Sequence, residues 1–478
     1  MEEGSPVKER LSEGWGEIRE EMKRLGYVAG PMVAVTLSFY MLQVISLMMV
    51  GHLGELALSS SAIAISLASV TGFSLLLGMA SALETISGQA FGAQQYEKIG
   101  TQTYTAIVSL ILVSIPVSIL WANVESVLKL SGQDPRISHE AGKMAICLIP
   151  ALFAYAILQP LIRYYQMQSM ISPMILSSCI TLCFHAPLCW VLVYKSGMGK
   201  VGGAVAMDLS MWLNVSILSL YMKYSPHCTR TRSPFSMEIF GGMGVFFKYA
   251  IPSATMICLQ WWSFELLILL AGLFPNPQLE ASVLSVCLNT VATLYAIPYG
   301  LASSASTRIS NQLGAGRPQG ARLSVVALLI LATVNAFVVS LAIFLNRNVF
   351  GYVFSNEKEV VDYVTRMAPL VCLSIIADCA QGVLSGVARG CGWQHIGAYI
   401  NLAAIYLFGL PIAAALGFWR DWRGKGLWIG VLCGAIMQCV MLSIITALTD
   451  WEKQAAKTRE RLFHEEAVND EGDDRLLT

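Results

Sequence analysis

The chain has 478 residues, of which 55% are hydrophobic and only 13% are charged, and its mean hydropathy is +0.60. This composition excludes an ordinary soluble domain and indicates a protein that crosses the lipid bilayer many times. The 31 basic and 31 acidic residues cancel, so there is no electrostatic reason to expect a nucleic acid as partner.

Residues 1–27 are polar and lack the apolar core of a cleavable signal peptide. Within them Trp15, Ile18, Met22 and Leu25 share one helical face, which predicts an amphipathic helix on the membrane surface. Residues 451–478 form a second polar tail at the other end of the chain.

Twelve apolar segments lie between the tails, and each is long enough to cross a hydrocarbon core of about 30 Å. They cover approximately residues 30–50, 57–88, 102–122, 138–162, 170–194, 203–223, 243–273, 280–310, 322–345, 359–388, 396–418 and 427–449. A polar linker, residues 225–240, separates the first six from the last six. We therefore expect an N-lobe over residues 28–224 and a C-lobe over residues 241–450. Lys and Arg are enriched in the cytosolic connections of membrane proteins. Of the two possible orientations, the one with both tails in the cytosol places most Lys and Arg residues on that side, so both termini are expected there.

The two halves of the chain repeat one another. Ile86-Ser-Gly-Gln89 matches Ile309-Ser-Asn-Gln312, Gln159 matches Gln381, and Pro187 matches Pro411, all at a nearly constant separation. Because six is an even number of spans, both halves enter the membrane from the same side, and the symmetry axis lies along the membrane normal. A translocation site is then expected between the two lobes.

Two acids lie deep in apolar segments of the second half. Glu265 is in the stretch IPSATMICLQWWSFELLILLAGLF and Asp378 is in LVCLSIIADCAQGVL. A carboxylate inside a span is costly and commonly marks an ion or substrate path, although a protonated acid that only joins neighbouring helices is the alternative. Their repeat counterparts, near Leu42 and Tyr155, do not titrate near neutrality. Proton or cation coupling is therefore expected in the second lobe.

Other polar residues in the spans are weaker candidates for a functional role. Glu84 and Asp208 lie near segment ends, where we expect them to reach headgroups or water and to serve structure or gating. Supporting hydrogen bonds are expected from Asn289, Thr290 and Tyr295, hinges from Pro31 and Pro298, and substrate contacts from Trp261, Trp262 and Gln43. For the hydrogen-bonding residues ordinary helix packing is the alternative, and for the prolines it is a static bend.

Three strings carry a resemblance to a known family. They are ALETISGQAFGAQQYEKIG at residues 82–100, SSASTRISNQLGAGRPQGAR at 303–322 and VLSGVARGCGWQ at 383–394. In them the chain resembles the multidrug and toxic compound extrusion (MATE) family, specifically its plant branch, over about residues 25–450.

The resemblance implies an all-α membrane protein of 12 transmembrane helices. These form two pseudo-symmetric six-helix lobes in a V around a central cavity, and the family exports organic compounds in exchange for cations. In plant members the acids that match Glu265 and Asp378 are associated with proton coupling. Many bacterial relatives use an Asp in the first span, which this chain lacks.

These observations predict a proton-driven antiporter, not an enzyme, that exports or sequesters xenobiotics or secondary metabolites. A lipid-headgroup flippase should have more cationic residues in its spans. An intramembrane enzyme should have a group of catalytic His or Ser residues in one lobe, whereas His185 is the only His well inside a span. We expect a monomer without cofactor or bound metal, whose partners are an organic small molecule, protons and the lipid bilayer. The sequence names neither the substrate nor the vacuolar or plasma membrane as its location.

Overall fold

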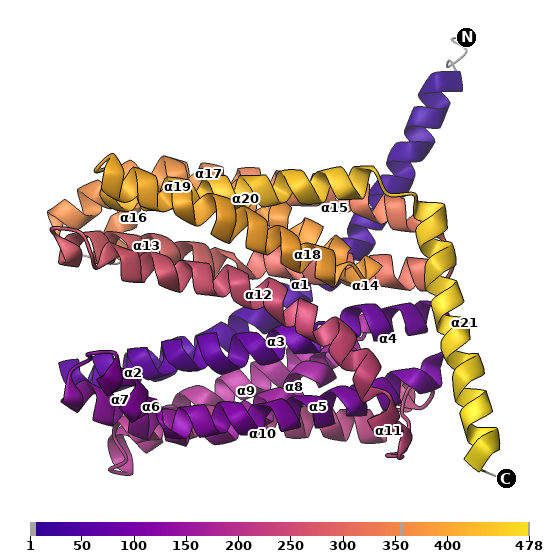
Figure 1. The fold of residues 1–478 in the computed structure, drawn as a ribbon, viewed down its shortest axis with the longest axis horizontal. Coiled ribbons are helices and arrows are strands. Elements are labelled where there is room, and N and C mark those ends of the chain that lie inside the picture. The colour runs from indigo at the N-terminus through magenta and orange to yellow at the C-terminus, as the bar shows by residue number, and fades with distance from the viewer. Residues whose placement is uncertain (1–5, 354–356, 477–478) are drawn as a thin grey trace. The chain divides into compact units, whose positions relative to one another are not determined.

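The computed structural model describes residues 6–353 and 357–476, which contain helices and no strands (Figure 1). In this part of the chain eleven helices are long and apolar enough to cross a membrane. The number is twelve when the bent pair α7 (Pro135–Cys147) and α8 (Ile149–Met167) counts as one span. The predicted all-α fold with twelve spans is confirmed.

The first half of the chain contains spans with pronounced irregularities. Its remaining helices are α1 (Pro6–Gly51), α2 (Glu55–Ala68), α3 (Ser74–Ala80), α4 (Leu83–Gly92), α5 (Tyr96–Ala122), α6 (Val124–Leu130), α9 (Ser172–Trp190) and α10 (Lys200–Tyr224). The π-helical segments η1 (Ser69–Phe73) and η2 (Val191–Lys195) interrupt or end two of the spans. Such π turns distort a helix locally and are frequent at functional sites.

The second half contains eleven further α-helices among its described residues. These are α11 (Glu238–Gly241), α12 (Met243–Ala271), α13 (Pro277–Leu294), α14 (Ala296–Gly314), α15 (Pro318–Leu345), α16 (Arg347–Phe350), α17 (Lys358–Cys391), α18 (Gln394–Asn401), α19 (Leu410–Ala414), α20 (Arg423–Ala447) and α21 (Trp451–Leu476). The 3-10 turns η3 (Pro226–Cys228) and η4 (Gly351–Val353) lie in connections. The π-helical segments η5 (Leu402–Gly409) and η6 (Ala415–Trp419) lie in the eleventh span.

Packing divides the chain into two compact units. Unit 1 comprises Met1–Val33, Gly88–Gln94 and Trp262–Thr478, and unit 2 comprises Ala34–Ser87 and Gln95–Trp261. Two long helices therefore belong to both units. The first, α1, changes unit just after Pro31, and α12 changes unit just before Glu265.

The first part of α1 is anchored in unit 1 by an ion pair between buried Glu21 and half-buried Arg308. Arg308 of α14 donates two hydrogen bonds to the Glu21 carboxylate, at 2.9 and 2.8 Å, and Ser324 of α15 donates a third at 2.6 Å. Ile18, Met22 and Leu25 pack against an apolar cluster of the same unit. The helix expected over the N-terminal residues thus continues without a break into the first span.

The last helix lies crosswise at the ends of α14 and α15 (Figure 1). Asp450 caps its first turn, accepting hydrogen bonds from the backbone N–H groups of Glu452 and Lys453, both at 3.1 Å. Farther along the helix, Gln454 donates to the Cys391 carbonyl at 2.8 Å and Arg461 donates to Gln89 of α4. This helix therefore joins the ends of α4 and α17 within unit 1.

Glycines bring α17 into close contact with α14. A Cβ atom added to Gly382 would lie 3.3 Å from Pro298, and one added to Gly386 would lie 2.3 Å from the Ala302 carbonyl oxygen. At Gly386 only glycine permits this approach, which resembles the small-residue packing common between membrane helices. The contact fixes the position of α17 and therefore of Asp378, which lies one turn before Gly382.

We expect Gly386→Ala to destabilise the protein by about 1–3 kcal/mol, because the methyl group would force the two helices apart. Thermal unfolding in detergent, followed by tryptophan fluorescence, measures the effect. Gly244→Ala in α12 is the matched control, since no atom lies within 4 Å of its added Cβ. Equal melting temperatures for Gly386→Ala and Gly244→Ala would contradict the packing argument.

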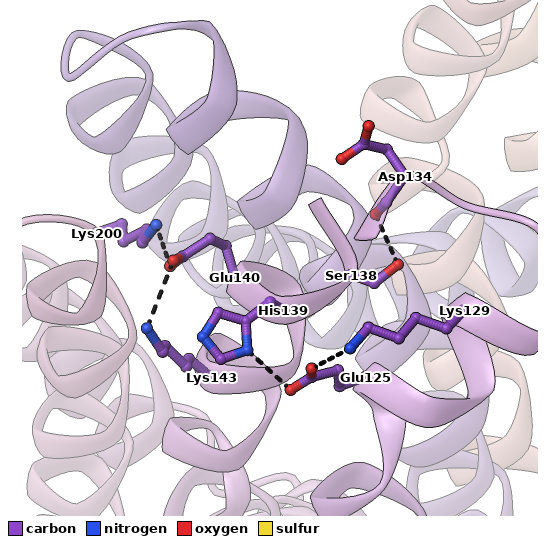
Figure 2. A network of polar contacts seen from close by, with 8 residues as sticks. All are labelled: Glu125, Lys129, Asp134, Ser138, His139, Glu140, Lys143 and Lys200. Carbon is purple, nitrogen blue, oxygen red and sulfur yellow. Dashed lines mark hydrogen bonds and ion pairs between the residues drawn. The ribbon is translucent and has the colours of Figure 1, made fainter. Parts of the chain in front are cut away.

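Charged residues cluster where α6 meets α7 in unit 2, as Figure 2 shows. The Glu125 carboxylate accepts hydrogen bonds from Lys129 at 2.6 Å and from His139 at 3.0 Å. Asp134 caps α7, accepting from the backbone N–H of Arg136 at 2.8 Å. Lys129, and after it His139, lower the pKa of Glu125 below its ordinary value.

A lowered pKa in the folded state stabilises the fold above the unfolded-state pKa and loses this contribution as the pH falls through the folded-state pKa. We therefore expect Glu125→Gln to lower the melting temperature slightly at neutral pH. The difference from the wild type should vanish below about pH 4. A difference that stays constant across this pH range would show that Glu125 acts through packing instead.

Candidate functional site

Asp378 lies on a pocket inside unit 1. Its side chain is 9% exposed and lies in the middle of α17. The pocket is lined by Phe264 and Leu267 of α12, Val291 of α13, Ser374 and Asp378 of α17, and Trp428, Val431, Leu432 and Ala435 of α20. Apart from Ser374 and Asp378 these lining residues offer mainly apolar surface, in which an ionised carboxylate is costly.

Hydrogen bonds between α17 and α20 hold the wall of this pocket. The indole N–H of Trp428 donates to Ser374 Oγ at 2.9 Å, and the Cys439 thiol donates to the Ala377 carbonyl at 3.3 Å. Both contacts lie within one turn of Asp378. They fix the backbone around the acid, which is itself one of the residues that line the pocket.

Glu265 lies on α12, between two residues that line the same pocket. Its neighbours Phe264 and Leu267 contribute to the lining, and Glu265 itself is half-buried. The structure therefore brings the helix segments that carry the two predicted acids to one pocket. Both acids belong to unit 1.

Tyr295 connects Asp378 to a residue that the sequence did not single out. It lies at the break between α13 and α14 and interacts electrostatically with both Asp378 and Arg389. Arg389, near the end of α17, is only 5% exposed. The sequence gives no direct sign of this burial, because a basic residue near the end of a span normally reaches water. Its place beside the glycines of α17 was the available signal of burial.

The other two predicted hydrogen-bonding residues do not join this group. The Thr290 side chain is buried, but its hydroxyl donates to the Val286 carbonyl of its own helix at 2.8 Å. Asn289 is exposed, and its backbone carbonyl accepts from Thr293 at 2.8 Å. Both residues lie on α13. This helix contributes Val291 to the lining of the pocket, whereas Asn289 and Thr290 are not among the lining residues.

The remaining predicted residues are distributed over both units. Trp261 and Trp262 are 38% and 43% exposed and lie on either side of the point where α12 changes unit. Gln43 is half-buried on the part of α1 that belongs to unit 2. The hinge candidates also differ, since Pro31 precedes a change of unit whereas Pro298 packs on Gly382 within unit 1.

Besides Glu21, three further acids are buried away from the pocket. Glu84 is 1% exposed and forms a 3.0 Å ion pair with Arg163, which is also 1% exposed. Asp208 is 7% exposed, so the expectation that these two acids reach headgroups or water is wrong. Glu280 is 2% exposed and accepts hydrogen bonds from the Tyr363 hydroxyl and the Gly424 N–H, each at 3.0 Å. It was missed because it begins a predicted segment, where an acid is usually a simple helix-start residue.

Comparison with known proteins gives one consistent result. A sequence profile of the MatE family matches residues 31–191 and 252–415. Protein DETOXIFICATION 12 of Arabidopsis thaliana is 55% identical over 462 residues, which cover 96% of each chain. Protein DETOXIFICATION 14 of the same plant is 56% identical over 467 residues, which cover 98% of this chain and 96% of the relative.

Solved structures agree with the sequence relatives. The crystal structure of the eukaryotic MATE transporter AtDTX14 is similar with a TM-score of 0.90 and 57% sequence identity, over 93% of this chain and 99% of that one. A MATE transporter of Vibrio cholerae, VcmN, has a TM-score of 0.81 at 16% identity, over 90% and 97% of the two chains. The second likeness concerns the fold alone.

Proposed function

Because this chain belongs to the MATE family of membrane transporters, we propose that it is a proton-driven antiporter that exports or sequesters organic compounds. Its substrates are xenobiotics or secondary metabolites, and its two lobes alternate between inward-open and outward-open states. The names of the relatives, which refer to detoxification, support this class of substrate. The chain is a transporter and not an enzyme.

The observation that carries the proposal is the buried Asp378 on a largely apolar pocket. A carboxyl group in such surroundings is more easily kept neutral, so it takes up a proton when one becomes available. Glu265 is the second proton-coupling residue, because its neighbours line the pocket. Tyr295 is the supporting residue that lies within electrostatic range of both Asp378 and Arg389.

Conformational coupling is supported by the position of Glu265 on α12. The helix passes from unit 2 to unit 1 just before this residue, so a change in how Glu265 is held acts on a helix that both units share. Pro31 stands in a similar position on α1, and its missing N–H gives that helix a point at which it bends easily. In this proposal Pro31 and Pro298 are hinges, while Trp261, Trp262 and Gln43 contact the substrate.

Asn289 and Thr290 keep their proposed supporting role only in a conformation in which α13 presents them differently. The transporter acts as a monomer, with both termini in the cytosol, in the vacuolar or the plasma membrane. These features rest on the charge pattern of the chain and on the family, and protease accessibility of tags in the polar linker and near Asn276 tests the orientation.

The purified protein in liposomes tests the function. An imposed pH gradient should drive accumulation of fluorescent organic cations and plant phenolic compounds, and the accumulation should collapse when a protonophore is added. A sodium gradient at fixed pH should drive none. Accumulation that follows sodium, or movement of labelled lipid headgroups without any pH gradient, would overturn the proton antiporter in favour of a sodium antiporter or a flippase.

A further inference from the structure

The fourth span of unit 2 is broken in the middle. Its two parts, α7 and α8, meet at Leu148 at an angle of 44°. The first turn of any helix leaves backbone N–H groups without partners in that helix. Here Pro150 also removes one donor, and the Ala151 N–H lies in the same turn of α8.

Asp208 of α10 supplies the missing partner. The backbone N–H of Ala151 lies close enough to the Asp208 carboxylate to act on it as a hydrogen-bond donor, so Asp208 reaches the start of α8 from a neighbouring helix. A negative charge at this position is also stabilised by the dipole of α8. The cap is therefore strong only while Asp208 is ionised.

The second oxygen of the same carboxylate has no such partner. Asp208 is 7% exposed, and its Oδ1 atom has no hydrogen-bond partner among the residues that the structure describes. No Lys or Arg in this part of the chain forms an ion pair with it. A proton would neutralise the buried charge at that oxygen, whereas a metal ion would require several more oxygen ligands than the site offers.

Among the groups around Asp208, we expect Asp208 itself to be the side chain that changes its charge with pH. Cys147 at the end of α7 is the titratable side chain that faces it, and α8 faces it with the Ala151 backbone. On α9 the imidazole of His185 is held by Ser46 and Ser210 at 3.1 and 2.9 Å. Glu140 of α7 forms ion pairs with Lys143 of the same helix and with Lys200 at the start of α10 (Figure 2).

We propose that Asp208 is a second proton-binding site, located in unit 2, and that its protonation releases the cap on α8 and changes the bend of the fourth span. The far end of α8 is held by the buried pair of Arg163 with Glu84, so movement is concentrated at the Leu148 end. Tyr155, one turn beyond Ala151, contacts Phe39 of α1 at 5.2 Å and Phe73 at 4.9 Å between ring centroids. Movement of α8 thereby reaches the helix that both units share.

Hydrogen–deuterium exchange of the detergent-purified protein tests this without any transport assay. In the wild type, the amide of Ala151 should exchange about fivefold faster at mildly acidic than at mildly alkaline pH, after correction for the intrinsic rate. In Asp208→Asn, which cannot ionise, this corrected pH response should disappear. It should persist in Asp378→Asn, which separates the result from the fate of the proposed antiport mechanism.

Asn214→Ala is the matched control, because Asn214 lies on the same helix, is equally buried and does not titrate. It should keep the wild-type pH response. If Asp208→Asn does not fold, infrared spectroscopy of the wild type and of Asp208→Glu provides the second measurement, since the band of a buried protonated carboxyl group should shift between them. A wild type whose corrected exchange at Ala151 is independent of pH, or a carboxyl band unchanged in Asp208→Glu, would overturn the proposal.

Discussion

Replacing Asp378 by Asn should reduce pH-gradient-driven export to the level of empty liposomes. Asn has nearly the size of the protonated acid but exchanges no proton, so the pocket would remain in its neutral form throughout the cycle. Glu265→Gln should have the same effect, since its helix lines the same pocket. The double mutant should be hardly worse than either single mutant, because coupled sites act as one unit.

Asp362→Asn is the control for this experiment. Asp362 lies on the same helix as Asp378 but is exposed, so removing its charge should leave export unchanged. Substrate binding, measured separately by fluorescence quenching, should survive in Asp378→Asn. Export that persists in Asp378→Asn, while the protein amounts in the liposomes are equal, would refute the role assigned to this pocket.

Replacing Arg308 by Ala should destabilise the protein by about 3 kcal/mol or more, because Glu21 would be left as a buried charge without its partner. Glu21 is 6% exposed, and two of its three hydrogen bonds come from Arg308. Thermal unfolding in detergent measures the loss. Glu21→Gln together with Arg308→Met should restore much of the stability, since no buried charge then remains.

Arg322→Ala provides the comparison for this prediction. Arg322 is an exposed basic residue of α15, near Ser324, and its loss should change stability by less than about 0.5 kcal/mol. A double-mutant cycle over Glu21 and Arg308 then isolates the energy of the pair. If Arg308→Ala and Arg322→Ala had the same melting temperature, the anchor of α1 in unit 1 would not depend on this ion pair.

The positions of the spans were accessible from the sequence because hydropathy reports directly on the length of apolar surface. The irregularities within them were not. Pro150 marks the bend at Leu148, but hydropathy alone does not show where a span bends, and it gives no sign of the π-helical segments η1 and η5. For the same reason the passage of α1 and α12 from one unit to the other could not be seen in the repeat of the two halves.

The candidate site was predictable to the same limited extent. An acid within an apolar stretch is conspicuous, so Glu265 and Asp378 could be named without a structure. Which neutral residues accompany them depends on how far each helix is rotated, which explains why Tyr295 interacts with Asp378 while Thr290 bonds to its own helix. Arg389 escaped notice because the charge pattern at the end of a span says nothing about close packing between helices.

The anchoring of α1 in unit 1 also determines the order in which this protein matures on the ribosome. Leu25 accepts a hydrogen bond at its carbonyl from Ser304, a residue that is synthesised 279 positions later. At about 5–20 residues per second the first helix waits roughly 15–55 s before its partner exists. During that interval Leu25 and Ala29, both buried in the finished protein, have only lipid, the insertion machinery or a chaperone to cover them. Nascent chains that stop before α14 therefore present this face to the quality-control machinery of the membrane.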